Sequence, residues 1–375
     1  MAMNQFKDKL SQYWRAMQVG LFPDLHVYLG QTTPREHHLI QVLEVVRIEE
    51  FCCDNGFATV GRPPCDRAAI ARSFVAKAIY RIPTTELLIE HLKANRVMRR
   101  ICGFEHPRQI PSESTYSRAF AEFAETDLPN RVHAAFVESR FAGHLFGHIA
   151  RDSTAAAARE KGEFKTKVKK EEALKRRGRP KKGEVLANAE PVEESMLQKQ
   201  LKMSKAELLK SVPKVCDVGS KVDSKGNKIS WKGYKLHLDT ADGRIPVSAI
   251  LSSASTHDSQ VAIPLSTLST ERVIYCYELM DSAYDSGLIR LNSHNKGHVP
   301  LIDHNKRRGK KIKFDPPDAQ RYKIRTIAEQ VNGRLKDEFG LLNIWVKKPK
   351  KVFCHMMFSV LALAGDEFLR FMSTA

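Results

Sequence analysis

The sequence contains no run of apolar residues long enough to cross a membrane. The longest run, residues 352–365, has 14 residues and includes His355, whereas a membrane-spanning helix needs about 20 apolar residues. The first residues also lack the apolar centre of a signal peptide. We therefore expect a cytoplasmic protein without membrane segments, in which residues 352–365 form a buried helix.

Paired cysteine motifs are absent as well. The seven cysteines include no Cys-x-x-Cys spacing, and only Cys52 and Cys53 are adjacent. An odd, scattered set of cysteines in a chain without an export signal indicates reduced thiols. We predict that all seven are small core residues.

Acidic residues are too few to balance the basic ones. The 375 residues carry 61 Lys or Arg against 43 Asp or Glu, a net charge of +18. Residues 159–182 hold twelve basic residues against four acidic ones, and residues 305–351 hold fifteen against five, so the rest of the chain is neutral. Two concentrated basic segments on a neutral body indicate a polyanionic partner, most often nucleic acid.

No strand pattern precedes residue 145. Apolar residues at helical spacing predict helices over residues 36–55, 66–80, 84–95, 112–124 and 127–141. Asp66 and either Thr84 or Thr85 are the expected N-caps, and Gly56 is the expected end of the first helix. We therefore predict an all-α N-terminal domain over residues 1–144.

Two of these helices, residues 84–94 and 112–124, are candidates for a helix-turn-helix-like unit. Arg118, with Ser114, Thr115 and Tyr116, would then face DNA from the second helix. The linker between the two helices is longer than a tight turn, so plain helical packing stays the alternative.

Residues 145–375 show a mixed pattern of strands and helices. Strands are predicted over residues 145–153, 231–238, 245–251, 273–280 and 298–303. Helices are predicted from about residue 259 and over residues 286–294, 318–338 and 352–371. Asp242-Gly243 is a hairpin turn signal, and the charged residues 159–215 are predicted to be a basic insertion, partly helical. This pattern predicts an α/β domain.

The segment 318–338 is the most informative one. On a helix of about 100° per residue, Arg325, Glu329 and Lys336 lie within about 60° of Tyr322. Four apolar residues lie on the opposite side: Ile324, Ile327, Val331 and Leu335. One carboxylate is thus flanked by cations and a phenol on a polar face, although ordinary surface pairs have the same spacing.

Two more carboxylates end predicted strands. Asp152 closes the run 145–150, and Asp281 closes the run 273–280. One such residue is usually a turn former or a helix cap. Three carboxylates on a common platform can hold two divalent cations, because Mg²⁺ prefers oxygen ligands, and such a site favours in-line phosphoryl displacement.

The run Tyr322, Arg325, Glu329, Lys336 resembles the signature of bacterial insertion-sequence DDE transposases, whose catalytic core has a ribonuclease-H-like fold. Further blocks resemble this family in the same order along residues 145–365, and residues 61–124 resemble its helical N-terminal domain. These blocks are Asp152-Ser153-Thr154, Gly233-Tyr234-Lys235-Leu236-His237, Thr256-His257-Asp258-Ser259 and Asp281-Ser282-Ala283-Tyr284-Asp285.

The resemblance implies a ribonuclease-H-like catalytic domain over residues 145–375, with Asp152, Asp281 and Glu329 as the catalytic, metal-binding triad for Mg²⁺ or Mn²⁺. Asp285 is the alternative second ligand. The implied reaction is cleavage of double-stranded DNA at terminal inverted repeats and transfer of the ends to a target. It implies a homodimer in the synaptic complex and a protein associated with the nucleoid.

The resemblance also places Tyr322, Arg325 and Lys336 beside the triad, where they would touch DNA phosphates or orient Glu329; packing alone stays open for Tyr322. In the insertion, residues 177–182 resemble an AT-hook core. Four of its side chains would contact DNA: Arg177, Arg179, Lys181 and Lys182. The basic clusters 306–313 and 347–351 flank the Glu329 helix and suit contacts to the DNA backbone.

Two other functions remain open. A catalytically inactive DNA-binding protein derived from a transposase would keep the fold and the charge. A metal-dependent nuclease of the same fold would share the site without transferring strands.

Overall fold

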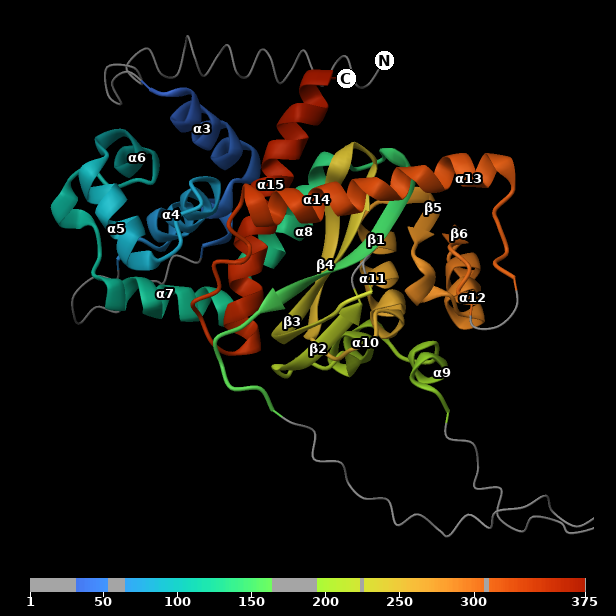
Figure 1. The fold of residues 1–375 in the computed structure, drawn as a ribbon. Coiled ribbons are helices and arrows are strands. Elements are labelled where there is room, and N and C mark those ends of the chain that lie inside the picture. The colour runs from blue at the N-terminus through green and yellow to red at the C-terminus, as the bar shows by residue number, and fades with distance from the viewer. Residues whose placement is uncertain (1–31, 53–64, 164–193, 223–225, 307–309, 375) are drawn as a thin grey trace, which may run out of the picture.

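The computed structural model describes residues 32–52, 65–163, 194–222, 226–306 and 310–374. In these residues a layer of helices precedes a six-stranded mixed sheet that carries helices on both faces (Figure 1). The predicted order, helices before residue 145 and strands mixed with helices after it, is therefore confirmed for the part of the chain described.

The N-terminal layer is built from short capped helices. Its α-helices are α3 (Pro34–Val46), α4 (Arg67–Ile79), α5 (Thr85–Ala94), α6 (Arg96–Ile101), α7 (Glu113–Glu125) and α8 (Leu128–Arg140). Asp66 Oδ1 accepts from the backbone N–H groups of Ala68 and Ala69 at 2.8 and 3.2 Å. Thr84 Oγ1 accepts from the Leu87 N–H at 3.2 Å. Both predicted caps are confirmed, because the local pattern that defines a cap suffices to place it.

The first helix is shorter than predicted. α3 ends at Val46 because Arg47 has a left-handed backbone conformation (φ 50°), and a 3₁₀ turn, Ile48–Phe51, follows. Gly56, the predicted end, lies outside the described residues. The helix α6 was not predicted, and it separates α5 from α7. The proposed helix-turn-helix pair is therefore not formed by consecutive helices.

The sheet has the strand order β2-β3-β1-β5-β6, with β4 also paired to β3. Its strands are β1 (Leu145–Ala157), β2 (Asp217–Val222), β3 (Lys228–Ala241), β4 (Ile245–Ser253), β5 (Ile274–Met280) and β6 (Val299–Ile302). The central strand β1 is antiparallel to β3 and parallel to β5. The predicted turn at Asp242-Gly243 joins β3 to β4, with Gly243 at φ 75°.

Gly233 lies where β3 passes closest to the end of β1. Its φ is +152°, and a Cβ at this position would lie 2.1 Å from the carbonyl oxygen of Ala156. Only glycine fits this close approach of two backbones.

Helices cover both faces of the sheet. On one face lie α11 (Ser259–Arg272) and α12 (Gly287–Asn295), with the short helices α9 (Met196–Gln200) and α10 (Lys205–Ser211) packed against α11. On the other face lie α14 (Thr326–Asp337), which crosses β1 in Figure 1, and α15 (Pro349–Thr374), with α13 (Pro316–Tyr322) ahead of α14. Because side chains alternate along a strand, successive residues of β1 face these two helix layers in turn.

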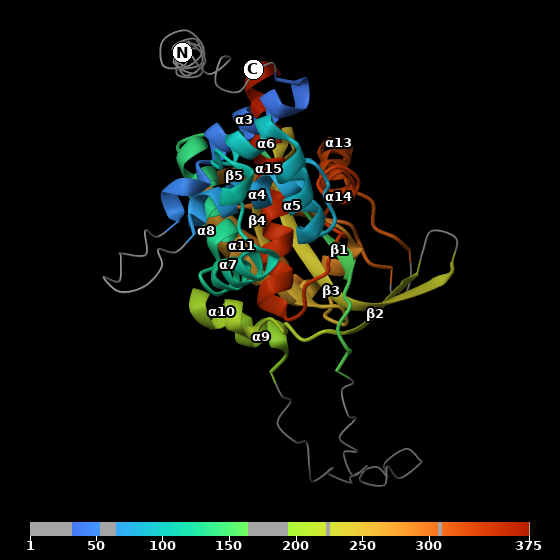
Figure 2. The same ribbon diagram turned by 90° about the vertical axis from the view of Figure 1, so that its left-hand side faces the viewer.

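The C-terminal helix α15 is the central core helix. By length and composition it could cross a membrane, but 83% of its most apolar stretch is buried inside the protein. It contacts α3, α4, α7 and α8 of the helical layer as well as β4 of the sheet (Figure 2). One hydrophobic core thus joins the N-terminal helices to the sheet, and a domain boundary between residues 144 and 145 stays a prediction.

Candidate functional site

Asp152 lies inside β1 and not at its end, so this part of the prediction was wrong. Antiparallel pairing with β3 continues through Asp152↔Leu238 as far as Ala157↔Gly233. The polar run after residue 151 suggested a strand end. The small residues that follow nevertheless extend the strand, because β3 offers them a pairing partner.

Asp281 directly follows the last residue of β5, as predicted. The parallel pairs between β1 and β5 end at Ala150↔Leu279, and two residues further along each chain come Asp152 and Asp281. The two aspartates are close enough for the charge of Asp281 to act on Asp152. The sheet therefore brings two of the three predicted catalytic carboxylates together.

The predicted helix 318–338 is divided by a 3₁₀ turn, Lys323–Arg325, so its residues do not follow one ideal helical wheel. The guanidinium of Arg325 pairs with the Glu329 carboxylate, whose side chain is 53% exposed. Burial raises the pKa values of both aspartates, and Arg325 lies near enough to both for its charge to oppose this rise. Arg325 thus stands between Glu329 and the aspartate pair.

Tyr322 stabilises the end of β5. Its hydroxyl donates to the Met280 carbonyl oxygen at 3.1 Å, and its ring packs against Phe314 with centroids 4.8 Å apart. Tyr322 therefore packs next to the residue that precedes Asp281, and its contact with DNA stays a prediction.

Asn332 belongs to the site and was missed in the sequence. Its Nδ2 donates to Asp152 Oδ2 at 2.9 Å, and its Oδ1 is buried without a hydrogen-bond partner in the described structure. The sequence signal was its spacing, since Asn332 follows Glu329 by three residues in α14 and therefore lies next to it on the helix surface. Lys336 follows one turn later, where burial lowers its pKa and the negative charge of Asp152 opposes that shift.

Burial dominates the electrostatics of the aspartates. It raises the pKa of Asp152 to about 6, although hydrogen bonds from the Ser153 N–H and from Asn332 and the charge of Arg325 oppose this. Burial also raises the pKa of Asp281, with a further contribution from the negative charge of Asp258. Two close carboxylates with raised pKa values are destabilised as anions, and a bound cation would relieve this.

The donor set fits a hard divalent cation in its chemistry. Asp152, Asp281 and the unpartnered Oδ1 of Asn332 offer only oxygen atoms, which Mg²⁺ and Mn²⁺ prefer. The arrangement is incomplete, because no group of three or more His, Cys, Asp or Glu side chains in the described residues is placed to hold a metal ion. Glu329, the third predicted carboxylate, pairs with Arg325 instead.

Asp285, the alternative second ligand, is engaged elsewhere. Its carboxylate accepts from Arg290 Nη2 and from the Asn305 N–H, both at 2.9 Å. The structure therefore favours Asp281 beside Asp152. His237, in another block of the family pattern, is fully buried and bonds Ser252 Oγ at 2.8 Å, as expected of a structural histidine.

On α7, the expected DNA-facing residues divide into two groups. Arg118 is exposed and bonds its own helix at Ser114 O, so it is free to point away from the protein. The expectation for Tyr116 was wrong, because this residue is fully buried and its hydroxyl donates to Ser73 Oγ at 3.3 Å. An aromatic ring at a core position of an amphipathic helix gains more from burial than from facing solvent.

The predicted basic contacts are only partly described. Arg177, Arg179, Lys181 and Lys182 lie outside the described residues, as do residues 307–309 of the cluster 306–313. In the cluster 347–351, which follows α14, Lys347, Lys348 and Lys350 are exposed, and Lys350 pairs with Glu125.

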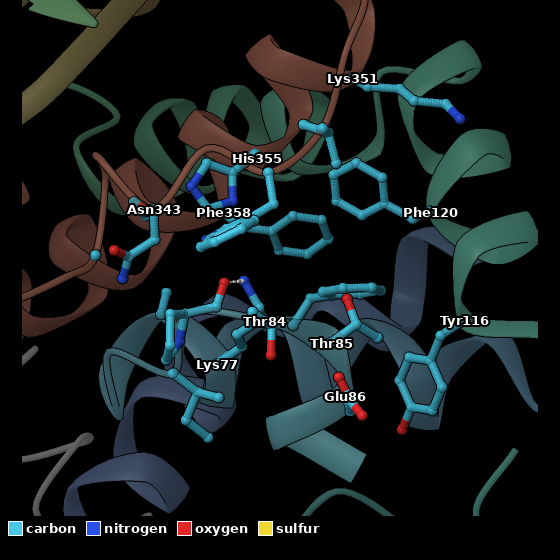
Figure 3. Close-up of a pocket in the computed structure, with 18 of the residues that line it drawn as sticks. Lys77, Thr84, Thr85, Glu86, Tyr116, Phe120, Asn343, Lys351, His355 and Phe358 are labelled. Carbon is cyan, nitrogen blue, oxygen red and sulfur yellow. Dashed lines mark hydrogen bonds between the residues drawn. The ribbon is translucent and has the colours of Figure 1, made fainter. Parts of the chain in front are cut away.

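A separate cavity of about 430 Å³ lies between the helical layer and α15 (Figure 3). Lys77 and His355 both reach it, and Lys77 Nζ donates to the Pro83 carbonyl oxygen at 3.1 Å. Burial lowers the pKa of Lys77 to about 8. None of the three predicted catalytic carboxylates is among its lining residues, so this cavity is distinct from the carboxylate site.

Comparison with protein-family models gives two matches. Residues 27–122 match the model described as "Transposase domain (DUF772)", and residues 211–364 match the one described as "Transposase DDE domain". The second match includes Asp281 and Glu329, whereas Asp152 lies between the two matched segments. No curated protein and no solved structure matched the chain significantly. Because both the helical layer and the carboxylate-bearing sheet match transposase domains, the chain belongs to the insertion-sequence DDE transposases.

Proposed function

We propose that this protein cuts DNA at the ends of an insertion sequence and joins the freed ends to target DNA, with Mg²⁺ or Mn²⁺ as the cofactor. The observation that carries the proposal is the pair of Asp152 in β1 and Asp281 just after the neighbouring strand β5, beneath the helix that bears Glu329. Its occurrence in a DDE transposase makes phosphoryl transfer on DNA the matching chemistry.

We infer a ribonuclease-H-like core from the strand arrangement. Three antiparallel strands in the order β4-β3-β1 continue into the parallel strands β5 and β6, with helices on both faces. The family match supports this inference.

In this proposal Asp152, Asp281 and Glu329 hold the divalent cations, which supply an activated water and stabilise the attacking and leaving oxygens. With cations bound, Glu329 would leave Arg325 and serve as the third carboxylate ligand. Arg325 is then free to bind a DNA phosphate, and Lys336 provides a second positive charge beside Asp152. No serine, cysteine or tyrosine nucleophile is required.

The DNA contacts are proposed along the basic surfaces. Tyr322, Arg325 and Lys336 would contact the backbone near the cleaved phosphate, and Arg118 would contact it from α7. Arg177, Arg179, Lys181 and Lys182 would bind the minor groove from the insertion. Two copies of the chain would hold two terminal inverted repeats, in the cytoplasm at the nucleoid.

The test uses DNA that carries the flanking inverted repeats of the element, with Mg²⁺ or Mn²⁺. We expect cleavage at the repeat ends and joining of the ends to target DNA. The substitutions Asp152→Ala, Asp281→Ala and Glu329→Ala should each abolish both. Asp285→Ala is the matched control, because this carboxylate is engaged by Arg290, and it should retain activity.

The other functions give different outcomes. Binding of the repeats without metal-dependent cleavage would identify an inactive DNA-binding descendant and would refute the proposal. Cleavage without joining would identify a nuclease.

A further inference from the structure

The residue next to Asp152, Arg151, lies on the opposite face of β1 in a fully buried ion network. Its Nε and Nη2 donate to the two carboxylate oxygens of Asp239 on β3, both at 2.8 Å. Nη2 also lies 3.3 Å from Glu278 Oε1 on β5. All three residues are at most 1% exposed, so none of them can touch DNA or a metal ion.

This network joins β1 and β5 at the point where their backbone pairing ends. The pairs between β1 and β5 end at Ala150↔Leu279, just before the two catalytic aspartates. Arg151 is the first residue of β1 past the last pair, and its side chain reaches Glu278 within the paired region and Met280 Sδ past it, the latter 3.3 Å from Nη1. Side-chain contacts of Arg151 therefore connect the two strands next to Asp152 and Asp281.

The carboxylates of the network have further partners. Glu278 Oε1 accepts from the hydroxyls of Ser266 and Tyr275, both at 2.8 Å, and Glu278 Oε2 accepts from Ser293 at 2.5 Å. Asp239 Oδ2 accepts from Ser269 at 2.6 Å. A network with this many directional bonds has one arrangement, so it fixes the strands it joins.

We propose that Arg151, Asp239 and Glu278 are positioning residues that set the separation and orientation of Asp152 and Asp281 for divalent-metal binding. This inference rests on the proposed function. Stability alone does not account for the network, because well-packed apolar residues of similar volume usually stabilise a buried site as well as an ion triad does. What a charged network adds is a defined geometry, and it is centred one residue from Asp152.

The side of β1 beyond Asp152 is held in the same way. Ser153 Oγ bonds Asp258 Oδ2 at 3.1 Å, and Asp258 Oδ1 accepts from Lys235 Nζ at 2.9 Å. Both chain neighbours of Asp152 are thus held by side-chain bonds.

Two variants of the full-length protein test the proposal. Glu278→Gln weakens the connection from β1 to β5 and leaves the pair of Arg151 with Asp239 intact. The triple variant Arg151→Met, Asp239→Asn, Glu278→Gln removes every charge of the network at nearly constant volume, so no buried charge is left unpaired. The control is Val137→Ala, a cavity variant at a buried position of α8 outside the ion network, which serves to match the variants' loss of melting temperature.

The main measurement is Mn²⁺ binding, followed by electron paramagnetic resonance as the metal alone is titrated into each protein. We expect the dissociation constant to rise about 10- to 100-fold in the triple variant, and less in Glu278→Gln, as for supporting residues of metal ligands. The Mn²⁺ concentration for half-maximal cleavage should rise in parallel, whereas excess Mn²⁺ should restore much of the rate. Val137→Ala should leave both quantities unchanged.

The outcomes test the positioning role of the network and the proposed function separately. Wild-type Mn²⁺ affinity in either folded variant refutes the positioning role and leaves the proposed function intact. A parallel loss of Mn²⁺ affinity in Val137→Ala refutes it too, because the effect would then follow stability. The proposed function and the inference both fail if the wild-type protein does not bind Mn²⁺. They also fail if it binds Mn²⁺ and Asp152→Ala does not abolish that binding.

Discussion

Replacing Asp152 with asparagine should stabilise the metal-free protein above pH 6. Burial raises the pKa of Asp152 from 3.8 to about 6, so in the folded protein the ionised carboxylate is less stable than in the unfolded chain. The amide of Asp152→Asn is neutral at every pH, and its oxygen can still accept the hydrogen bond from Asn332. The variant therefore loses a destabilising charge and keeps the contact.

The magnitude follows from the two pKa values. They differ by about two pH units, and each unit is worth about 1.4 kcal/mol, which gives about 3 kcal/mol above pH 6. Solvent screening of this partly exposed group reduces the expected gain to about 1–3 kcal/mol. Below pH 4 the carboxyl group is protonated in both states, so the gain should vanish there, and it should grow between pH 4 and 6.

The assay is urea unfolding in EDTA at several pH values between 4 and 7.5. The control is Asp285→Asn, which should have the opposite sign. Although burial acts against it, the Asn305 N–H and Arg290 hold the pKa of Asp285 below its ordinary value. Mg²⁺ should then stabilise the wild-type protein much more than Asp152→Asn. The reasoning is refuted if Asp152→Asn is no more stable than wild type at pH 7.5, or if its gain does not change with pH.

Three further predictions concern single side chains. Arg325→Ala should slow cleavage at least about tenfold. It should change the free energy of unfolding by less than about 1 kcal/mol, because the ion pair of Arg325 with Glu329 is partly exposed. Full activity of this variant in cleavage kinetics would exclude a role for the guanidinium. Burial lowers the pKa of His133 to about 3. Between pH 6.5 and 3 the unfolded chain therefore binds a proton at His133 that the folded protein excludes. The free energy of unfolding should fall by about 1.4 kcal/mol for each pH unit over this range. His133→Gln should reduce that slope in urea unfolding, and an unchanged slope would contradict the assignment. Tyr116→Phe should leave DNA affinity unchanged. Arg118→Ala should weaken DNA affinity and reduce the slope of its dependence on salt concentration by about 1. Equal losses of DNA affinity in the two variants, measured by fluorescence anisotropy, would argue against a buried Tyr116.

Features that depend on neighbours along the chain were predicted from the sequence. The caps at Asp66 and Thr84, the turn at Asp242-Gly243 and the position of Asp281 after a strand are local patterns, and the structure has all of them. They need no knowledge of distant residues.

Features that depend on distant partners were missed or misplaced. The strand β2 forms at the edge of the sheet with exposed Val218 and Val222, so it shows no apolar alternation that would predict it. Asp152 was placed at a strand end because its pairing partner in β3 is not visible locally. Asn332 contacts Asp152 across 180 positions in the sequence, and only the fold reveals that contact.

The alternation of side chains along β1 links the stability of the sheet to the geometry of the site. Arg151 and Asp152 are neighbours in sequence, yet one lies in the buried network and the other faces α14. A slip of β1 by one residue would exchange their faces, placing a carboxylate against Asp239 and Glu278 and a guanidinium at the proposed metal site. Both placements would bring like charges close together: the carboxylate would meet two carboxylates, and the guanidinium would meet Arg325, which already lies on the catalytic face. The buried network therefore selects the one register in which Asp152 stands beside Asp281.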